Sequence, residues 1–193
     1  MRVDRLDKTS TRPRDRRITR RRLLELGAYG ALACALPRPA QAARRARERA
    51  LAFYNTHTDE RLHSVYWADG DYQPASLREI DHLLRDHRTG DVVAIDRNLL
   101  ELLHRIQLEL ATREPFHVIS GYRSPATNAM LRAQGGGVGR RSLHMQGKAI
   151  DIFVPGREAS ELRRTARALR AGGVGYYPKP GFVHVDVGRV RYW

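Results

Sequence analysis

Two histidines and an aspartate in the last third of the chain could together bind a divalent metal ion. His144 and Asp151 stand seven residues apart around Gly147, and His184 follows in a later apolar segment. Two imidazole nitrogens and one carboxylate oxygen are the ligand set of a catalytic zinc site, in which a fourth coordination position stays open. Each residue taken alone is more often structural, so the prediction of one Zn²⁺ ion depends on the three occurring together.

A hydrolytic zinc site also needs a proton acceptor and a cation beside the reacting bond. Asp186 follows His184 by two residues, and its carboxylate is the candidate general base that would take a proton from water and pass it to the leaving amine. Arg123 stands in a predicted turn after a strand, and its guanidinium is the candidate for stabilising the oxyanion. Together with the metal ligands, these side chains would allow the hydrolysis of an amide bond.

Predicted strands explain how residues so far apart in the sequence could meet. One strand is expected at residues 149–154, and the last hairpin at residues 175–177 and 182–187. If the strands that carry Asp151 and His184 are neighbours, both side chains can reach one point on a shared face of the sheet. His144 precedes its strand on a loop that could fold over the same point.

The rest of the chain favours an α+β fold with a mostly antiparallel sheet flanked by helices. Ser76 and Glu79 have the spacing of a capping box at the start of one helix. Asp96 is the expected cap of a second helix, whose apolar residues recur at helical spacing as far as Leu110. Further elements are expected at residues 51–66 (one or two edge strands), 116–120 (strand), 126–134 (helix) and 160–171 (helix).

The first 42 residues have the features of an export signal. Thr19–Leu24 resembles a twin-arginine motif, and an apolar segment and a small-x-small cleavage site that ends at Ala42 follow it. We expect a signal peptide at residues 1–42 that directs the protein to the periplasm, a basic linker at residues 43–52 and a catalytic domain at residues 53–193. The alternatives are a basic tail or lipidation at Cys34.

The charge and cysteine content narrow the possible partners. The formal net charge is +14, and residues 1–42 contribute half of it, with 11 basic and 4 acidic side chains. The remaining excess could favour binding to an anionic surface such as nucleic acid, acidic lipid or an anionic polymer, and the alternative is a solvated basic surface without a partner. A nucleic-acid partner is not expected, because the chain has no recognition helix or aromatic stacking motif. The apolar segment of the leader is too short to span a membrane, and the body contains no cysteine.

Three blocks of the sequence resemble the M15 zinc peptidases, in particular their periplasmic branch of murein endopeptidases. They are Ser120–Ser124, Ser142–Asp151 and His184–Asp186, and the resemblance covers roughly residues 53–193. It implies a hedgehog/D-Ala-D-Ala peptidase fold and one zinc ion bound by His144, Asp151 and His184. It also implies cleavage of peptide crosslinks in peptidoglycan, with Arg123 at the position of the substrate- or oxyanion-binding arginine.

Two departures from the family pattern leave alternatives open. Many members carry an acidic general base three residues before the last histidine, whereas Gly181 stands there in this chain. Asp186 could replace that base, or the domain could be a metal-containing module that binds peptidoglycan or a protein without cutting. Relatives with a His-x-His motif use the second residue of the pair as ligand, so Asp186 could bind the metal in place of His184. The bond cleaved and the oligomeric state stay open.

Overall fold

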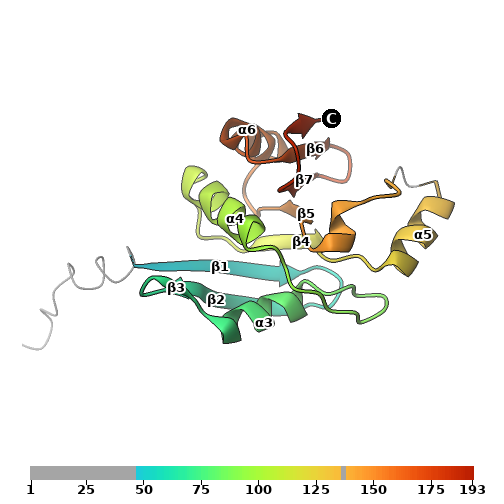
Figure 1. Cartoon of the computed structure of the whole chain (residues 1–193). Coiled ribbons are helices and arrows are strands. Elements are labelled where there is room, and N and C mark those ends of the chain that lie inside the picture. The colour runs from blue at the N-terminus through green and yellow to red at the C-terminus, as the bar shows by residue number, and fades with distance from the viewer. Residues whose placement is uncertain (1–46, 136–137) are drawn as a thin grey trace, which may run out of the picture. The chain divides into compact units, whose positions relative to one another are not determined.

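The structure, a computed structural model, describes residues 47–135 and 138–193 (Figure 1). The predicted export signal and residues 43–46 lie outside this part of the chain. The described strands are β1 (Glu48–Asn55), β2 (Arg61–Ala68), β3 (Asp71–Tyr72), β4 (Phe116–Ser120), β5 (Ala149–Phe153), β6 (Gly173–Tyr177), β7 (Phe182–Asp186) and β8 (Arg191–Tyr192). The helices are α3 (Pro74–Leu83), α4 (Arg97–Glu109), α5 (Pro125–Ala133), α6 (Ala159–Leu169) and the 3₁₀ turn η1 (Leu143–Gln146).

All of the described strands join one sheet, in the order β3-β2-β1-β4-β5-β7-β6-β8. Neighbouring strands pair antiparallel except for β1 with β4 and β6 with β8, which pair parallel. The prediction of a mixed α and β fold with a mostly antiparallel sheet is therefore confirmed.

The apolar core lies on one face of this sheet, under helices. Helix α3 packs on β2, α4 on β1, and α6 on β6 and β7, while α4 and α6 also contact each other. Alternate residues of the central strands point into this core, as do the apolar positions predicted for α4. The fully buried core side chains include Leu51, Phe53, Phe116, Ile150, Ile152, Val183 and Val185.

The opposite face of β5, β7 and β6 carries the polar residues. In the β5–β7 pair, Asp151 lies directly opposite His184, and residues opposite one another in a ladder share a face. In the β7–β6 pair, His184 lies opposite Gly175. The two strands that carry Asp151 and His184 are therefore neighbours, which is the condition under which both side chains can reach one point.

Helix α4 begins as the sequence predicts, whereas α3 does not. The side chain of Asp96 accepts a hydrogen bond from the backbone N–H of Asn98 at 2.9 Å, so it caps α4. The predicted capping box at Ser76 is wrong, because α3 begins two residues earlier at Pro74, with Gln73 as its N-cap. Proline suits the first helical position because its φ is already helical and its missing N–H has no partner to lose there.

Residues 51–66 contribute to two strands, as predicted, but the prediction that these strands lie at the edge of the sheet is wrong. Strand β1 lies between β2 and β4, and β2 lies between β3 and β1, so both are inside the sheet. Strand β1 also begins at Glu48, so the end of the segment predicted as a linker pairs with β2. Across the described residues, no helix is long and apolar enough to cross a membrane.

Candidate active site

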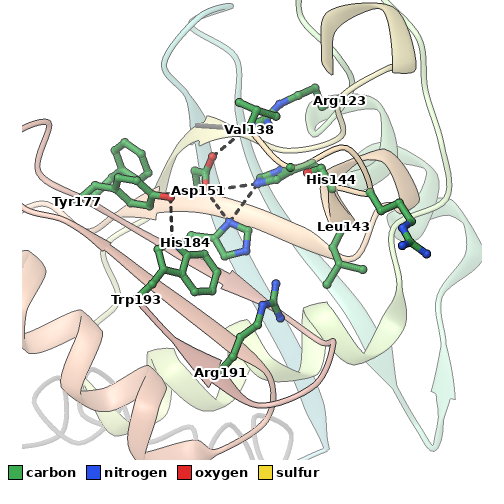
Figure 2. A pocket seen from close by; sticks show the side chains of 13 residues that line it. Arg123, Val138, Leu143, His144, Asp151, Tyr177, His184, Arg191 and Trp193 are labelled. Atoms are coloured by element: carbon green, nitrogen blue, oxygen red, sulfur yellow. Dashed lines mark hydrogen bonds and ion pairs between the residues drawn. The ribbon is translucent and has the colours of Figure 1, made fainter. Parts of the chain in front are cut away.

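His144, Asp151 and His184 converge on one point beside β5 and β7 (Figure 2). Nε2 of His144 lies 3.1 Å from Nδ1 of His184 and 3.4 Å from Oδ1 of Asp151. The third side of this triangle, from His184 Nδ1 to Asp151 Oδ1, is 2.9 Å. Three ligand atoms about 2.0–2.1 Å from a tetrahedral ion are separated from one another by roughly 3.3 Å. The triangle therefore has nearly the size that a metal ion requires.

The local backbone brings His144 to this point. It lies in the 3₁₀ turn η1, which ends at Gly147 with a left-handed φ of 64°. A Cβ at position 147 would lie 2.6 Å from the carbonyl oxygen of Ala94, so the loop needs glycine both for its φ and for space. The backbone N–H of Asp96 also donates to the carbonyl of Gly147 at 2.9 Å.

Hydrogen bonds outside the cluster determine which nitrogen of each ring faces it. Nδ1 of His144 donates to the carbonyl oxygen of Gly121 at 2.7 Å, which leaves the lone pair of Nε2 directed into the cluster. Nε2 of His184 lies 2.9 Å from Oδ2 of Asp186 and donates to it, which leaves Nδ1 directed inward. With both rings neutral, two lone pairs and a carboxylate meet without a proton between them, and a cation at their centre would remove this repulsion.

The electrostatics of the cluster agree with this donor set. Burial alone would raise the pKa of Asp151, but His144 and His184 outweigh burial and hold the pKa of that carboxyl well below its usual range. Burial alone would lower the pKa of His184, yet its hydrogen bonds to Asp151 and Asp186 raise it. A proton on His184 therefore competes with a metal ion, and metal affinity should increase as pH rises.

Asp186 lies behind His184, on the side of the ring away from the cluster. Its side chain is fully buried. Oδ1 accepts the backbone N–H of Gly173 at 3.0 Å and that of Gly188 at 2.9 Å, and Oδ2 accepts from Nη2 of Arg191 at 2.7 Å. Burial would raise the pKa of Asp186, but His184, Arg191 and these N–H groups lower it well below its usual range. Both oxygens already accept hydrogen bonds from these groups, so the arrangement favours a role in orienting His184 over the predicted role as general base.

Arg123 lies beside the cluster, next to Asp151. Its Nη2 donates to Oγ of Ser120 at 3.2 Å and lies 3.5 Å from Oδ2 of Asp151. Its backbone N–H donates to the carbonyl of His144 at 3.2 Å, which ties the turn after β4 to η1. Burial lowers the pKa of the Arg123 guanidinium, and the charge of Asp151 opposes this. The structure therefore brings the predicted cation to the predicted metal ligands.

A pocket of about 380 Å³ opens over the cluster. Among the described residues that line it, Asp151 is the only carboxylate, whereas three arginines are present. The lining residues are Arg123, Val138, Gly139, Arg141, Ser142, Leu143, His144, Asp151, Tyr177, Phe182, His184, Arg191 and Trp193. The pocket is therefore cationic, and its acidic group is one of the candidate metal ligands.

Sequence reasoning missed two aromatic residues of this pocket, Tyr177 and Trp193. Tyr177 is the last residue of β6, and Trp193 follows β8, which returns to pair parallel with β6. Tyr177 was expected only as part of a hairpin. Strand β8, which places Trp193, has two residues and pairs with a strand far away in the sequence, so it gives little signal there. The available signal was the alternation of residues in β6, which puts Tyr177 on the same face as Gly175 and hence His184.

The sequence matches a family model and several known proteins. A family model described as Peptidoglycan L,D-endopeptidase MepK matches residues 42–193. The Peptidoglycan L,D-endopeptidase MepK of Escherichia coli strain K12 is 42% identical over 175 residues, which cover 90% of this chain and 96% of that protein. The Probable peptidoglycan L,D-endopeptidase MepK of Haemophilus influenzae is 44% identical over 148 residues, 76% of this chain and 80% of that protein. No solved structure is significantly similar to the chain.

Proposed function

The chain belongs to the M15 peptidase family, and we propose that it is a zinc-dependent endopeptidase that hydrolyses peptide crosslinks of peptidoglycan. The observation that carries this proposal is the buried triangle of His144, Asp151 and His184 at the base of a cationic pocket. The names of the relatives indicate that the bond cleaved joins an L- to a D-centre. The support for a hedgehog/D-Ala-D-Ala peptidase fold is the same family membership.

We propose that His144 Nε2, Asp151 Oδ1 and His184 Nδ1 bind one Zn²⁺ ion. When bound, zinc supplies Lewis acidity and a hydroxide-like nucleophile at neutral pH. Imidazole and carboxylate are ordinary zinc donors, and the described cluster contains no thiolate that would favour a softer metal. Gly121 and Asp186 hold the two rings in the tautomers that such binding needs.

Arg123 is the proposed stabiliser of the oxyanion. Its guanidinium is largely buried, with 9% of the residue exposed, and it lines the pocket next to Asp151. A cation in a site with little water stabilises the negative charge that develops on the carbonyl oxygen far more than it would in bulk solvent. Because Ser120 and Asp151 already hold this side chain, it needs little rearrangement when substrate binds.

Asp186 is proposed to position His184. Its carboxylate accepts a hydrogen bond from the Nε2–H of His184, as in the carboxylate–histidine pairs that orient metal ligands. This role replaces the one expected for it as a base. The missing acid at Gly181 leaves the described pocket without a free carboxylate, and this observation favours the second candidate function, a metal-containing module that binds peptidoglycan or a protein without cutting it.

Digestion of purified sacculi separates the two candidates. The protein is incubated with sacculi, with and without a chelator, and the released fragments are identified by mass spectrometry. We expect crosslinked fragments to be cleaved, and the chelator to stop cleavage. Binding without any chelator-sensitive cleavage would favour the second candidate. Zinc analysis of His144→Ala, Asp151→Ala and His184→Ala tests the ligands separately, since unchanged zinc in any variant removes that residue from the set.

The proposed substrate lies outside the cytoplasm, so we also propose export. The support is the sequence Thr19–Leu24, which resembles a twin-arginine motif, and the small residues up to Ala42. In this proposal, residues 1–42 are a signal that is removed in the periplasm, and residues 53–193 contain the zinc peptidase domain. Residues 43–52 contain a basic linker, whose last part already belongs to β1 from Glu48 onward. The N-terminal sequence of protein recovered from the periplasm should begin near residue 43, and a retained leader would refute cleavage.

A further inference from the structure

We propose that Tyr177 is a further catalytic residue, whose phenol donates a hydrogen bond to the scissile carbonyl oxygen as negative charge develops there. The inference rests on the proposed peptidase function and adds a second donor to Arg123. The phenol only donates a hydrogen bond, so no proton is transferred in this step. Trp193 acts as a positioning residue that holds the phenol in place.

The strand register puts Tyr177 on the face of the sheet that carries the metal ligands. Tyr177 pairs with Phe182, and Gly175 pairs with His184. Because side chains alternate along a strand, Tyr177 and Gly175 point to the same side as His184. The adjacent Tyr176 points to the other side, where the guanidinium of Arg163 lies 4.9 Å from its ring centre.

The tyrosine ring has a fixed position in the pocket wall. It stacks on the ring of Phe182, with centroids 4.6 Å apart and planes inclined by 20°. Figure 2 shows its hydroxyl end turned toward the side of the pocket where Asp151 and His184 lie. Tyr177 lines the pocket, and 37% of the residue is exposed.

The hydrogen bond to Trp193 leaves the phenol proton free. Nε1 of the Trp193 indole donates to the hydroxyl oxygen of Tyr177 at 3.0 Å. An indole N–H can only donate, whereas a phenol both accepts and donates. The bond therefore occupies an acceptor position of the oxygen, and no acceptor for the hydroxyl proton is found among residues 47–135 and 138–193. An unused donor in a pocket that contains an amide-cleaving metal site suits a developing oxyanion.

Backbone hydrogen bonds and the small residue Gly175 hold the indole of Trp193 next to the Tyr177 hydroxyl. The backbone N–H of Trp193 donates to the carbonyl of Val174 at 3.2 Å, and its carbonyl accepts the N–H of Tyr176 at 3.0 Å. A Cβ on Gly175 would lie 2.6 Å from the indole, so glycine makes room for the indole across β6. The indole also lies 5.2 Å from the ring of His184, centre to centre. The tryptophan thus contacts a metal ligand and the phenol at once.

Tyr177 would add an unshared donor to the pocket, whereas the two arginines nearest the cluster already have acidic partners. Nη2 of Arg123 is already shared between Ser120 and Asp151, and the guanidinium of Arg191 is held by Asp186. Arg123 and Tyr177 line the same pocket, Arg123 from the turn after β4 and Tyr177 from the end of β6.

Replacement of the hydroxyl tests the proposal. Tyr177→Phe keeps the ring and its stacking on Phe182, and we expect kcat on a soluble crosslinked muropeptide to fall by about 10²-fold, with KM changed by less than about threefold. Zinc content should stay at one ion. A phosphinic pseudopeptide, in which a tetrahedral phosphinate replaces the scissile amide, should bind the variant more weakly by a similar factor. Tyr176→Phe is the matched control and should behave as wild type.

Removal of the indole donor tests the positioning role. Trp193→Phe keeps an aromatic ring beside His184 but removes the hydrogen bond to the phenol. We expect kcat to fall roughly tenfold. When Trp193→Phe is added to Tyr177→Phe, kcat should not fall below that of Tyr177→Phe alone. A Tyr177→Phe enzyme with wild-type kcat, or one that has lost its zinc, would overturn the inference. If wild type itself cleaves nothing, the proposed function fails; equal affinity of wild type and Tyr177→Phe for the phosphinic ligand would then overturn the role of Tyr177 separately.

Discussion

The two nitrogens of His184 have different partners, and this difference gives Asp186 its role. Nδ1 faces His144 and Asp151, while Nε2 donates to the carboxylate of Asp186 at 2.9 Å. A spacing of two residues in a strand predicts that both side chains share a face, but it says nothing of which ring nitrogen each neighbour contacts. The sequence therefore predicted the residues of the cluster, while the orientation of the ring needed coordinates.

The positioning role of Asp186 makes a prediction that separates it from the role of a base. In Asp186→Asn the amide oxygen can still accept from Nε2 of His184, but the negative charge is lost and the amide NH₂ takes the place of the oxygen that accepts from Gly173 and Gly188. We expect the affinity for zinc to fall by about 10–100-fold, as is usual for partners that orient a ligand. Excess zinc should then restore most of the activity. The measurements are zinc dissociation constants from competition with a chelating dye, and kcat at saturating zinc.

A general base would behave differently in the same experiment. If the carboxylate of Asp186 accepted a proton in the reaction, kcat would stay low by about 10²-fold or more however much zinc were added. That outcome would return Asp186 to its expected role. Glu161→Gln serves as the control. It removes a carboxylate of α6 that forms an ion pair with Arg157, just before the helix.

At the scale of elements, local patterns were easier to predict than distant pairings. Helix α4, with its Asp96 cap and apolar stripe, follows from residues close together in the sequence. The pairing of β1 with β4 joins Phe53 to Phe116, and its parallel direction requires the intervening helices to cross over. No local pattern encodes such a pairing, which is why β1 was expected at an edge. The same limit hid β8, and with it the place of Trp193 in the pocket.

Asp86 connects two loop segments beside the site. Its Oδ1 accepts the backbone N–H of Arg88 at 2.9 Å, and its Oδ2 accepts the backbone N–H of Ser124 at 2.8 Å. Ser124 in turn caps α5, since its Oγ accepts the N–H of Thr127 at 3.1 Å. Burial would raise the pKa of Asp86, but the hydrogen bonds from Thr127, Ser124 and Arg88 hold it well below its usual range.

We expect Asp86→Asn to lower the free energy of unfolding by about 2 kcal/mol at pH 7, because charge-assisted hydrogen bonds to a buried group are lost. The depressed pKa means that this stabilisation is present above the ordinary aspartate pKa of about 3.9 and is lost as pH falls below it. The difference between wild type and variant should therefore shrink at pH 3. Urea unfolding at both pH values measures it. Asp91→Asn, in the same loop, is the control; a difference that does not change with pH would contradict the assignment.

At the scale of the whole domain, the candidate site brings together the strands β5 and β7 and the 3₁₀ turn η1 on the face of the sheet away from the core. The core lies on the helix-covered face, and the candidate ligands lie on the other face, in β5, β7 and the 3₁₀ turn η1. An ion bound there would connect η1 and its loop to the sheet. The affinity of the folded state for the ion then adds to the stability of the fold, because the unfolded chain does not bring the three ligands together.

Removal of the metal should therefore lower the unfolding temperature of the whole domain. With free zinc at 1,000 times its dissociation constant, binding adds about 4 kcal/mol, which for a domain of this size corresponds to roughly 8–16 °C in Tm. Calorimetry in a zinc buffer and in excess chelator measures the difference. His144→Ala should unfold at nearly the same temperature in both solutions, because one ligand is missing, whereas Tyr177→Phe should respond as wild type does. If the wild-type Tm were the same in zinc buffer and in chelator, the His-Asp-His triangle would be held by its own hydrogen bonds and would bind no ion.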